Sequence, residues 1–346
     1  MRTEILEAVQ TRLTGAKTER MSEAPQIDLS VVVPIYNEVE NVALLAGDIL
    51  REVGKLNQSF EVILVNDGSN DGSADALDAL ARQHPGVKVI HFERNYGQTA
   101  AMAAGLEAAV GKAIVTMDGD RQNDPADIGM LVDKLDEGYA CVSGWRQKRQ
   151  DTGIRRWPSV VANRLISKVT GVRLHDYGCT LKAYRAGALN PGQMFGEMHR
   201  FLPVYVATGG GKVAEMVVRH HPRTAGVSKY GLNRTVRVLA DLFLIRLLTK
   251  YRTRPSHLFA RMAQFMGLFG LALLILAMVE KVRRTGAFFG IPFLTAVLMM
   301  VGAVIVLTVG LCTELVVRGH YLGTERSYWR VARRVNFDHE PDRQSG

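Results

Sequence analysis

The first half of the chain repeats one pattern four times: an apolar run, a polar turn, and a segment with helical periodicity. The four apolar runs are LSVVVPI, FEVILV, VKVIHF and KAIVTM. Runs that are apolar at nearly every residue are typical of parallel strands covered on both faces. Strands that alternate with helices predict an α/β fold with a mostly parallel sheet and right-handed crossovers.

The polar turns follow the carboxyl ends of these predicted strands. In open parallel sheets, ligands bind at those ends. The turns after the first, second and fourth strands are therefore expected to meet at one crevice. They contribute the following residues: Tyr36, Asn37, Glu38, Asp67, Asp118 and Asp120.

The fourth turn, VTMDGDRQNDP (residues 115–125), carries the strongest chemical signal. If the chain stays extended, Asp118, Asp120 and Gln122 point to one face, because alternate residues of a strand share a face. Two carboxylates and an amide oxygen are suitable ligands for Mg²⁺ or Mn²⁺. A polar turn that only ends the strand explains the same stretch. These residues alone leave both interpretations open.

The pattern is less regular after Tyr139. YACVSGWR and VAEMVVRHHPR are predicted strands, and SVVANRLISKVTG is a predicted amphipathic helix that ends at Gly171. Three of the histidines after this helix lie on different elements without zinc-ligand spacing and are expected to have surface or structural roles. They are His199, His220 and His221.

Two long apolar stretches dominate residues 258–317. The predicted spans, about 261–281 and 288–312, match the ~20 residues that a membrane-spanning helix needs. The short link EKVRRTG makes the two spans a hairpin. Two buried soluble helices are the alternative, but helices this long and apolar on all faces are rare in soluble cores.

Charge defines the segments around the hairpin. The net charge is +9, and Lys and Arg gather on both sides of the apolar region. By the positive-inside rule, the large domain and both ends of the hairpin are expected in the cytoplasm. Residues 231–257 are predicted amphipathic helices at the membrane interface, with a core-facing helix as the alternative. Residues 1–26 are a polar extension without the apolar core of a signal peptide, and residues 318–346 a predicted basic tail.

Five motifs resemble those of family 2 glycosyltransferases, which have the GT-A fold. They are VVVPIYNE, VNDGSNDGS, RNYGQTAAMAAG, DGDRQNDP and DYGCTLKAYR. Together with the apolar hairpin they are similar, more narrowly, to the polyisoprenyl-phosphate glycosyltransferases. That group includes dolichyl-phosphate mannose synthases and undecaprenyl-phosphate glucosyl- and formamido-arabinosyl-transferases. The similarity runs from about Leu29 to Arg318.

The resemblance implies a membrane-bound, inverting enzyme with a GT-A catalytic domain at residues 27–230. It would transfer a sugar from a nucleotide-sugar, UDP-linked by comparison with the bacterial relatives, to a polyprenyl phosphate such as undecaprenyl phosphate. The lipid-linked product would serve cell-envelope glycan or lipid modification. The resemblance further implies Mg²⁺ or Mn²⁺ as cofactor, the bacterial inner membrane as location, and a homotetramer. Nucleic acid is not an expected partner.

The resemblance also implies roles by position. Residues implied in nucleotide and donor binding are Pro34, Tyr36, Glu38, Asp67, Asp118, Ser228 and Lys229. The implied metal ligands are Asp118, Asp120 and Gln122, and the implied catalytic residues are Asp120 and Asp176. Arg146 and Arg164 would bind the acceptor phosphate. Arg121 and Asp124 depart from the usual metal motif and are expected to point away from the metal.

The chemistry of the acceptor limits the role of Asp176. A phosphate monoester has a second pKa of about 6, so at neutral pH it is largely a dianion and needs no strong base. Asp176 is therefore expected to orient the acceptor or its arginines at least as much as it takes a proton.

Other functions stay open at this point. A processive polysaccharide synthase would need more membrane helices and an acceptor motif such as QxxRW, which the sequence lacks. A different lipid acceptor, or a non-catalytic nucleotide-binding membrane scaffold, is the remaining alternative. The intact acids argue against the scaffold, and a nucleic-acid binder would have the charge but none of the motifs.

Overall fold

The computed structural model describes the following residues: 27–147, 163–164, 166–167, 170–189, 191, 194, 198–222, 256–283, 290–322 and 329–337. The predicted extension 1–26 and residues 231–255 of the predicted interface helices lie outside them. The chain divides into two units, and each is described by itself. The sheet unit comprises residues 1–163, 174–229 and 328–346, and the hairpin unit comprises residues 164–173 and 230–327.

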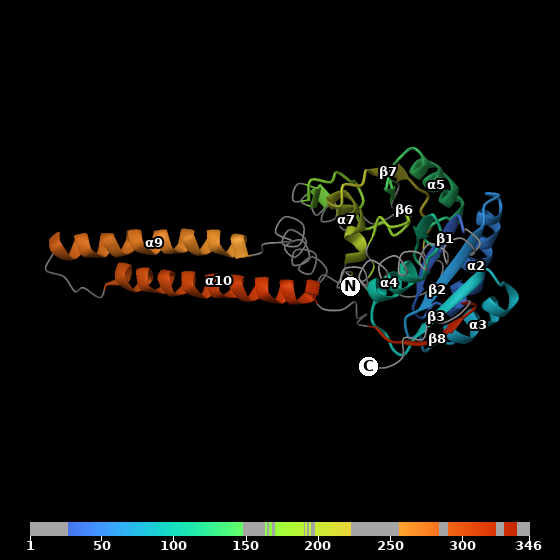
Figure 1. Ribbon diagram of the computed structural model, residues 1–346, viewed down its shortest axis with the longest axis horizontal. Helices are drawn as coiled ribbons and strands as arrows, with labels where there is room; N and C mark the ends of the chain where they lie inside the picture. Colours follow the sequence, from blue (N-terminus) through green and yellow to red (C-terminus); the bar gives the residue numbers. More distant parts are fainter. Residues whose placement is uncertain are drawn as a thin grey trace, which may run out of the picture. The chain divides into compact units, whose positions relative to one another are not determined.

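The sheet unit contains one eight-stranded sheet in the order β7-β5-β6-β4-β1-β2-β3-β8. Its strands are β1 (Leu29–Ile35), β2 (Phe60–Asn66), β3 (Val87–Phe92), β4 (Ala113–Thr116), β5 (Cys141–Trp145), β6 (Lys182–Arg185), β7 (Val213–Val217) and β8 (Val331–Val335). The four strands predicted from the repeat pair in parallel, and β5 also pairs in parallel with β7. β6 and β8 are antiparallel to their neighbours. The predicted α/β fold with a mostly parallel sheet is confirmed (Figure 1).

Helices cover both faces of this sheet. They are α2 (Val39–Gly54), α3 (Ser73–Gln83), α4 (Gln98–Ala108), the 3₁₀ turn η1 (Pro125–Asp127), α5 (Ile128–Asp136), the 3₁₀ turn η3 (Met198–Phe201) and α7 (Leu202–Thr208). The apolar sides of α2, α3 and α5 pack on one face, and α4 and α7 pack on the other. Alternate residues of β1 enter the two cores, so the strand is fully buried as its continuous apolar run predicts.

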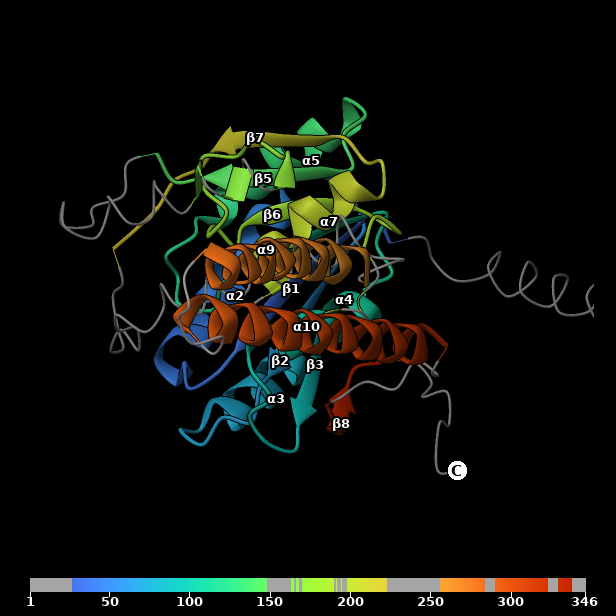
Figure 2. The ribbon, with the colours of Figure 1, turned by 90° about the vertical axis from the view of Figure 1, so that its left-hand side faces the viewer.

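The last strand lies in a segment that the sequence analysis assigned to a basic tail. Residues 329–337 belong to the sheet unit, and β8 pairs with β3 at one edge of the sheet (Figure 2). The strand is short and reads VARRV, without the apolar run that identifies the buried strands. An edge strand needs little apolar character because one side of it faces solvent, which explains why the sequence pattern did not reveal it.

The hairpin unit contains two long helices, α9 (Ser256–Arg283) and α10 (Ile291–Leu322), which lie side by side (Figure 1). Residues 258–279 and 291–316 have mean hydropathies of 2.2 and 2.5 and are long enough to cross a membrane. Glycines allow close approach: a Cβ on Gly310 would stand 2.4 Å from the Cβ of Phe259, and one on Gly302 would stand 2.7 Å from the terminal carbon of Met266. The outer faces are large exposed apolar side chains, as a pair of lipid-facing helices requires.

Candidate active site

The acidic stretch does not stay extended, so this part of the sequence prediction is wrong. β4 ends at Thr116, and the chain turns at Gly119 and Asp120 before Arg121, whose φ is +59°. The Asp120 Oδ1 accepts a hydrogen bond from the backbone N–H of Gln122 at 3.2 Å. The sequence does not predict an arginine with a left-handed backbone conformation here, because that region of backbone space favours glycine and asparagine.

The turn nevertheless places the acids at the carboxyl end of β1. A Cβ on Gly119 would stand 2.7 Å from the Ile35 Cδ1 and 3.1 Å from the Pro34 carbonyl oxygen. A larger residue would have to displace the end of the Ile35 side chain and would crowd the Pro34 carbonyl oxygen. The glycine therefore explains how a turn after β4 comes directly against the end of β1, where Asp118 and Asp120 flank the contact.

Asp118 is partly buried next to a second carboxylate. Its removal from water and the nearby charge of Asp120 raise its pKa above the ordinary range, while Thr180, Arg146 and Lys182 oppose the rise. A carboxylate whose ionisation is opposed by a second carboxylate beside it suits a divalent cation, which stabilises the charged form. Within the described residues, no group of three or more His, Cys, Asp or Glu side chains gathers to hold a metal, so further ligands would be amide oxygen, water or substrate.

Gln98 holds Asp118 in place. This residue begins α4, and its Nε2 donates to the Asp118 Oδ1 at 2.7 Å. The bond fixes one oxygen of the carboxylate. The sequence analysis quoted the motif RNYGQTAAMAAG but assigned no role to Gln98, because the motif alone does not say which residue reaches the acids.

The two departures from the usual metal motif point away from the acids, as expected, although the turn and not strand alternation is the reason. The Arg121 Nη2 donates to Asp48 of α2 at 3.1 Å. Asp124 accepts from the backbone N–H of Ala126 at 3.0 Å and contacts His221 at 3.1 Å, which gives that histidine a structural role.

The turns after β1 and β2 are tied together by hydrogen bonds. The Asn37 N–H donates to the Ser69 Oγ at 3.0 Å, and the Asn70 N–H donates to the Asn37 Oδ1 at 2.9 Å. The Glu38 N–H donates to the Ser73 Oγ at 3.0 Å. The predicted convergence of these turns is therefore present, and the Tyr36 ring stands exposed at their edge.

Asp67 is buried, and its carboxylate is engaged by the chain after β3. It accepts from the backbone N–H of Tyr96 at 2.7 Å, from the N–H of Gly97 at 3.0 Å, and from the Asn95 Nδ2 at 2.9 Å. Burial raises the pKa of Asp67 to about 6, against these hydrogen bonds, which lower it. Asp67 thereby positions the loop that leads into Gln98, and its contact with a nucleotide stays a prediction.

The second half of the site is an ion pair. The Arg146 Nε donates to the Asp176 Oδ2 at 2.7 Å, and its Nη2 donates to the Asp176 Oδ1 at 3.1 Å. The two side chains are only 10% and 6% exposed. The Gly178 N–H also donates to the Asp176 Oδ1, at 3.0 Å. Burial alone would lower the pKa of Arg146, but Asp176 raises it above the ordinary range, so the guanidinium is a permanent cation.

Glu215 of β7 supports this pair. Its carboxylate accepts from the backbone N–H groups of His175, at 2.9 Å, and Asp176, at 3.0 Å. It also contacts the His175 Nδ1 at 2.7 Å, and the His175 ring stacks on Trp145 with centroids 4.2 Å apart. The sequence analysis missed Glu215, because it lies far along the chain from the segment it positions.

Lys182 is a second buried basic residue in this half. It lies in β6, and its Nζ donates to the carbonyl oxygens of Tyr177, at 3.4 Å, and Cys179. Burial lowers the pKa of Lys182. Its charge and that of Arg146 both lower the pKa of Asp118, so the acidic turn and the ion pair belong to one polar cluster.

Some predicted residues are not placed in this cluster. Ser228 and Lys229 lie outside the described residues. Arg164 lies in a helical turn with an exposed side chain and belongs to the hairpin unit. Their roles stay predictions.

Comparison with known proteins identifies the family. Residues 30–191 match the model of glycosyl transferase family 2. The chain is 39% identical over 301 residues to the dodecaprenyl-phosphate galacturonate synthase of Rhizobium johnstonii, covering 85% of this chain and 89% of the relative. It is 36% identical over 315 residues to the undecaprenyl-phosphate 4-deoxy-4-formamido-L-arabinose transferase of Pseudomonas aeruginosa, covering 90% and 89%. The chain belongs to glycosyltransferase family 2.

Among solved structures, the chain is similar to glucosyl-3-phosphoglycerate synthase from Mycobacterium tuberculosis, determined with Mn²⁺, UDP and phosphoglyceric acid. The TM-score is 0.47 and the identity 21%, covering 64% of this chain and 78% of that one. The predicted membership of family 2 is confirmed by the sequence relatives.

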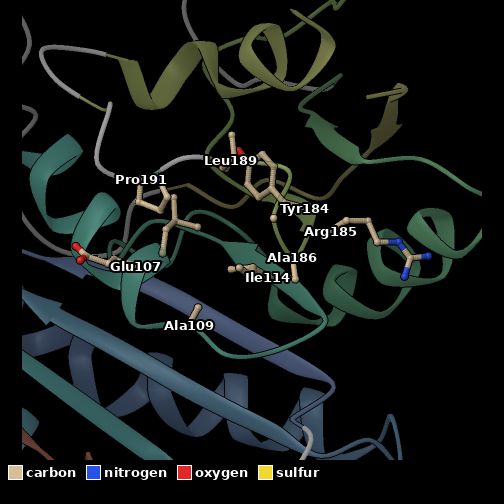
Figure 3. A pocket seen from close by; sticks show the side chains of 10 residues that line it. Glu107, Ala109, Ile114, Tyr184, Arg185, Ala186, Leu189 and Pro191 are labelled. Atoms are coloured by element: carbon tan, nitrogen blue, oxygen red, sulfur yellow. The ribbon is translucent and has the colours of Figure 1, made fainter. Parts of the chain in front are cut away.

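The sheet unit also contains a cavity away from Asp118 and Asp120. It has a volume of about 210 Å³ and lies at the amino end of β4, near Ile114, Tyr184 and Pro191 (Figure 3). Asp118 follows the other end of the same strand. The cavity therefore lies apart from the polar cluster around Asp118.

Proposed function

We propose that this glycosyltransferase moves a sugar from a nucleoside diphosphate donor, a UDP-sugar, to a polyprenyl phosphate such as undecaprenyl phosphate, with inversion at the anomeric carbon. The observation that carries the proposal is the polar cluster in which Asp120, Arg146 and Lys182 all act on the Asp118 carboxylate, while Arg146 is paired with Asp176. Such a cluster suits two phosphate-bearing substrates. The printed names of both sequence relatives, which describe polyprenyl-phosphate sugar transfer, support the same class.

A divalent cation, Mg²⁺ or Mn²⁺, fits the acidic turn. Asp118 and Asp120 are adjacent carboxylates, and the first has a raised pKa partly because of the second. A bound cation would remove that repulsion and neutralise charge on the donor diphosphate as it leaves. We propose Asp118 and Asp120 as its protein ligands, with the Gln122 amide oxygen as a further one.

The donor nucleoside would contact the turns after β1 and β2. A hydrogen bond from the Asn37 N–H to the Ser69 Oγ joins these two turns, so together they form one edge of the proposed pocket. Tyr36 supplies an exposed ring for the base. Pro34 and Glu38 lie two residues to either side of it in the chain and would line the same part of the pocket. Asp67, Ser228 and Lys229, whose donor contacts the resemblance implies, would complete the donor pocket.

The acceptor phosphate would lie near Arg146, with Arg164 as a second predicted contact. Bringing its dianion within ~5 Å of the donor diphosphate costs roughly 3 kcal/mol per pair of unit charges at an effective dielectric of ~20. The fixed cations of the cluster offset this repulsion. Because the Asp176 carboxylate already accepts two hydrogen bonds from Arg146 and one from Gly178, we propose that it orients the guanidinium and does not act mainly as a base.

The reaction is a single displacement. An oxygen of the acceptor phosphate forms a bond to the anomeric carbon on the face opposite the leaving group. The bond between that carbon and the donor diphosphate breaks, and its electron pair leaves with the nucleoside diphosphate. The acceptor is already ionised, so no proton has to move in this step. The positive charge that develops on the sugar is stabilised by the surrounding phosphates and carboxylates.

The two helices α9 and α10 would anchor the enzyme in the membrane, where its lipid acceptor lies. We propose that both cross the bilayer and that the excess of Lys and Arg outside the link keeps the sheet unit in the cytoplasm of a bacterial cell. A homotetramer is the assembly that the resemblance implies. A different lipid acceptor would keep the same chemistry, whereas a non-catalytic scaffold would leave the acid pair without purpose.

The test uses the full-length protein purified in detergent, with undecaprenyl phosphate, Mg²⁺ or Mn²⁺, and a panel of UDP-, GDP- and dTDP-sugars. The expected result is release of nucleoside diphosphate and formation of lipid-linked sugar, only when both lipid and metal are present. The Asp120→Asn variant is the matched control and should be inactive. Nucleotide binding without turnover on any lipid phosphate would favour the scaffold, and absence of nucleotide binding would exclude the enzyme.

A further inference from the structure

The strand that follows the hairpin is firmly docked on the sheet unit. β8 pairs with β3, and Trp329 stacks on Phe92 with ring centroids 6.3 Å apart. The Asn336 Nδ2 donates to the carbonyl oxygens of Ala81, at 2.6 Å, and Val87, at 2.8 Å. Both ends of β8 therefore have side-chain contacts in addition to the strand pairing.

An arginine of β8 reaches into the unit. The Arg333 Nη1 donates to the Asp78 Oδ1 of α3 at 2.9 Å, and its Nη2 donates to the other oxygen. The same Asp78 Oδ1 lies 3.0 Å from the Nε2 of His91 on β3. Burial raises the pKa of Asp78, but Arg333 and His91 together lower it below its ordinary value, so its carboxylate is ionised and can only accept hydrogen bonds.

The ionised carboxylate sets the direction of the bonds beyond it. Because Asp78 accepts, the hydrogen of the neutral His91 ring is on Nε2. The Nδ1 is then an acceptor, and the Asn66 Nδ2 lies 3.0 Å from it. With its NH₂ group turned to His91, Asn66 presents its Oδ1 to the backbone N–H of Ser69 at 3.0 Å. His91 therefore fixes the orientation of the Asn66 amide.

The chain of bonds ends at the donor loops. Ser69 lies in the turn after β2, and its Oγ accepts the Asn37 N–H from the turn after β1. A sequence of directed hydrogen bonds thus runs from β8, through Asp78 and His91, to both turns that we assign to the donor nucleoside.

We propose that Arg333, Asp78 and His91 are positioning residues for the donor site, and that β8 holds the turns after β1 and β2 in their binding geometry. This inference rests on the proposed function for the identity of the ligand. It adds that the segment after the hairpin contributes to donor affinity without touching the donor. Loss of the bonds should weaken nucleotide-sugar binding and leave the chemical step unchanged.

The test compares variants in the full-length enzyme. Arg333→Ala should raise the KM for the nucleotide-sugar roughly 3- to 10-fold, the range for losing one or two hydrogen bonds, with kcat near wild type. Arg333→Lys should restore part of the loss, because a lysine keeps the charge on Asp78 but not the two-pronged contact. Arg334→Ala is the matched control: it is the next residue of β8, its guanidinium lies over Phe337, and it should leave the KM unchanged.

A second variant interrupts the same series of hydrogen bonds inside the sheet unit, at His91. His91→Phe keeps a ring of similar size and removes both hydrogen bonds, so it should raise the same KM without changing the KM for the lipid acceptor. An unchanged donor KM in both Arg333→Ala and His91→Phe, in folded protein, overturns the proposal. So does an equal fall in kcat for every variant, including Arg334→Ala.

A measurement that does not need turnover separates this inference from the proposed function. Hydrogen exchange of the backbone amides of residues 66–71 should be faster in Arg333→Ala than in Arg334→Ala. Faster exchange in a protein that transfers no sugar would support the role of these hydrogen bonds and reject only the proposed function. Unchanged exchange in an active enzyme would reject the role of these hydrogen bonds and retain the proposed function.

Discussion

The donor and acceptor halves of the proposed active site are held together by different interactions. On the donor side, the turns after β1, β2 and β4 are held by backbone N–H groups, short polar side chains and one close glycine contact. On the acceptor side, the segment around Asp176 is held by charges: Arg146 pairs with it, and Glu215 accepts from its backbone.

This difference predicts how each half responds to loss of a charge. In the donor half, Asp118 and Asp120 repel each other, so the folded chain is strained by their ionisation. In the acceptor half, Arg146 and Asp176 form a buried pair of opposite charges, so removing one leaves the other unpaired. Removing a charge from the donor half should therefore lower activity without lowering stability. Removing a charge from the acceptor half should lower both.

The largest effect on turnover is expected for Asp120→Asn. Transfer should fall by at least ~10²-fold, since one preorganised electrostatic contact to the transition state contributes about that much. The melting temperature in the absence of metal should stay equal to wild type or rise, because the asparagine keeps the Oδ1 that accepts from Gln122 and removes the repulsion with Asp118. Turnover assays and thermal unfolding with and without Mn²⁺ check both parts. A marked drop in metal-free stability would contradict the comparison.

Asp176→Asn should have a smaller effect on turnover and a larger effect on stability. Arg146 is 10% exposed and would lose its partner, which costs about 3–5 kcal/mol when a buried pair is broken. Transfer should fall less than in Asp118→Asn, because the acceptor dianion needs no base. The decisive measurement is the ratio of the two residual activities in folded protein: a loss as complete as that of Asp118→Asn would restore Asp176 as an obligatory base.

Glu215→Gln should have an intermediate effect confined to the acceptor. The amide keeps one oxygen for the His175 and Asp176 N–H groups but loses the charge that strengthens these bonds. The KM for the lipid phosphate should rise several-fold while the KM for the nucleotide-sugar stays constant. Steady-state kinetics with each substrate varied in turn distinguishes this from general unfolding, which would lower kcat against both.

The smallest effect is a pH dependence on the donor side. Burial and Arg333 lower the pKa of His91 below 6.5, against Asp78, which raises it. The unfolded chain therefore binds the proton more readily, and stability from this group falls as the pH falls through 6.5 toward the folded pKa. Protonation also removes the Nδ1 acceptor, so donor KM should rise on acidification more in wild type than in His91→Phe. The same dependence of the donor KM on pH in both proteins would show that protonation of His91 does not affect donor binding.

Much of the donor half could be predicted from the sequence, because each motif acts within its own turn. The bounds of β1 follow from its apolar run LSVVVPI, and the spacing of Asp118 and Asp120 made them candidate metal ligands, which stays a prediction. The extended geometry of the acidic stretch was wrong, since no residue type signals the left-handed Arg121.

The acceptor half and β8 could be predicted only in part, because their contacts join distant segments. Asp176 was assigned from a local motif, whereas Glu215 lies 39 residues further along the chain. Likewise Arg333 reaches Asp78 across 255 residues. No local periodicity encodes such pairs. Gln98 is an intermediate case: its motif was noted, but only the packing of α4 shows that it meets Asp118.

The position of β8 has a consequence for how the protein is made. The ribosome completes β3 long before it reaches β8, and the whole apolar hairpin is synthesised in between. Until β8 emerges, the outer edge of β3 has unpaired backbone groups, the kind of edge at which chains aggregate. The sheet is thus finished only after both long apolar helices, α9 and α10, have been synthesised.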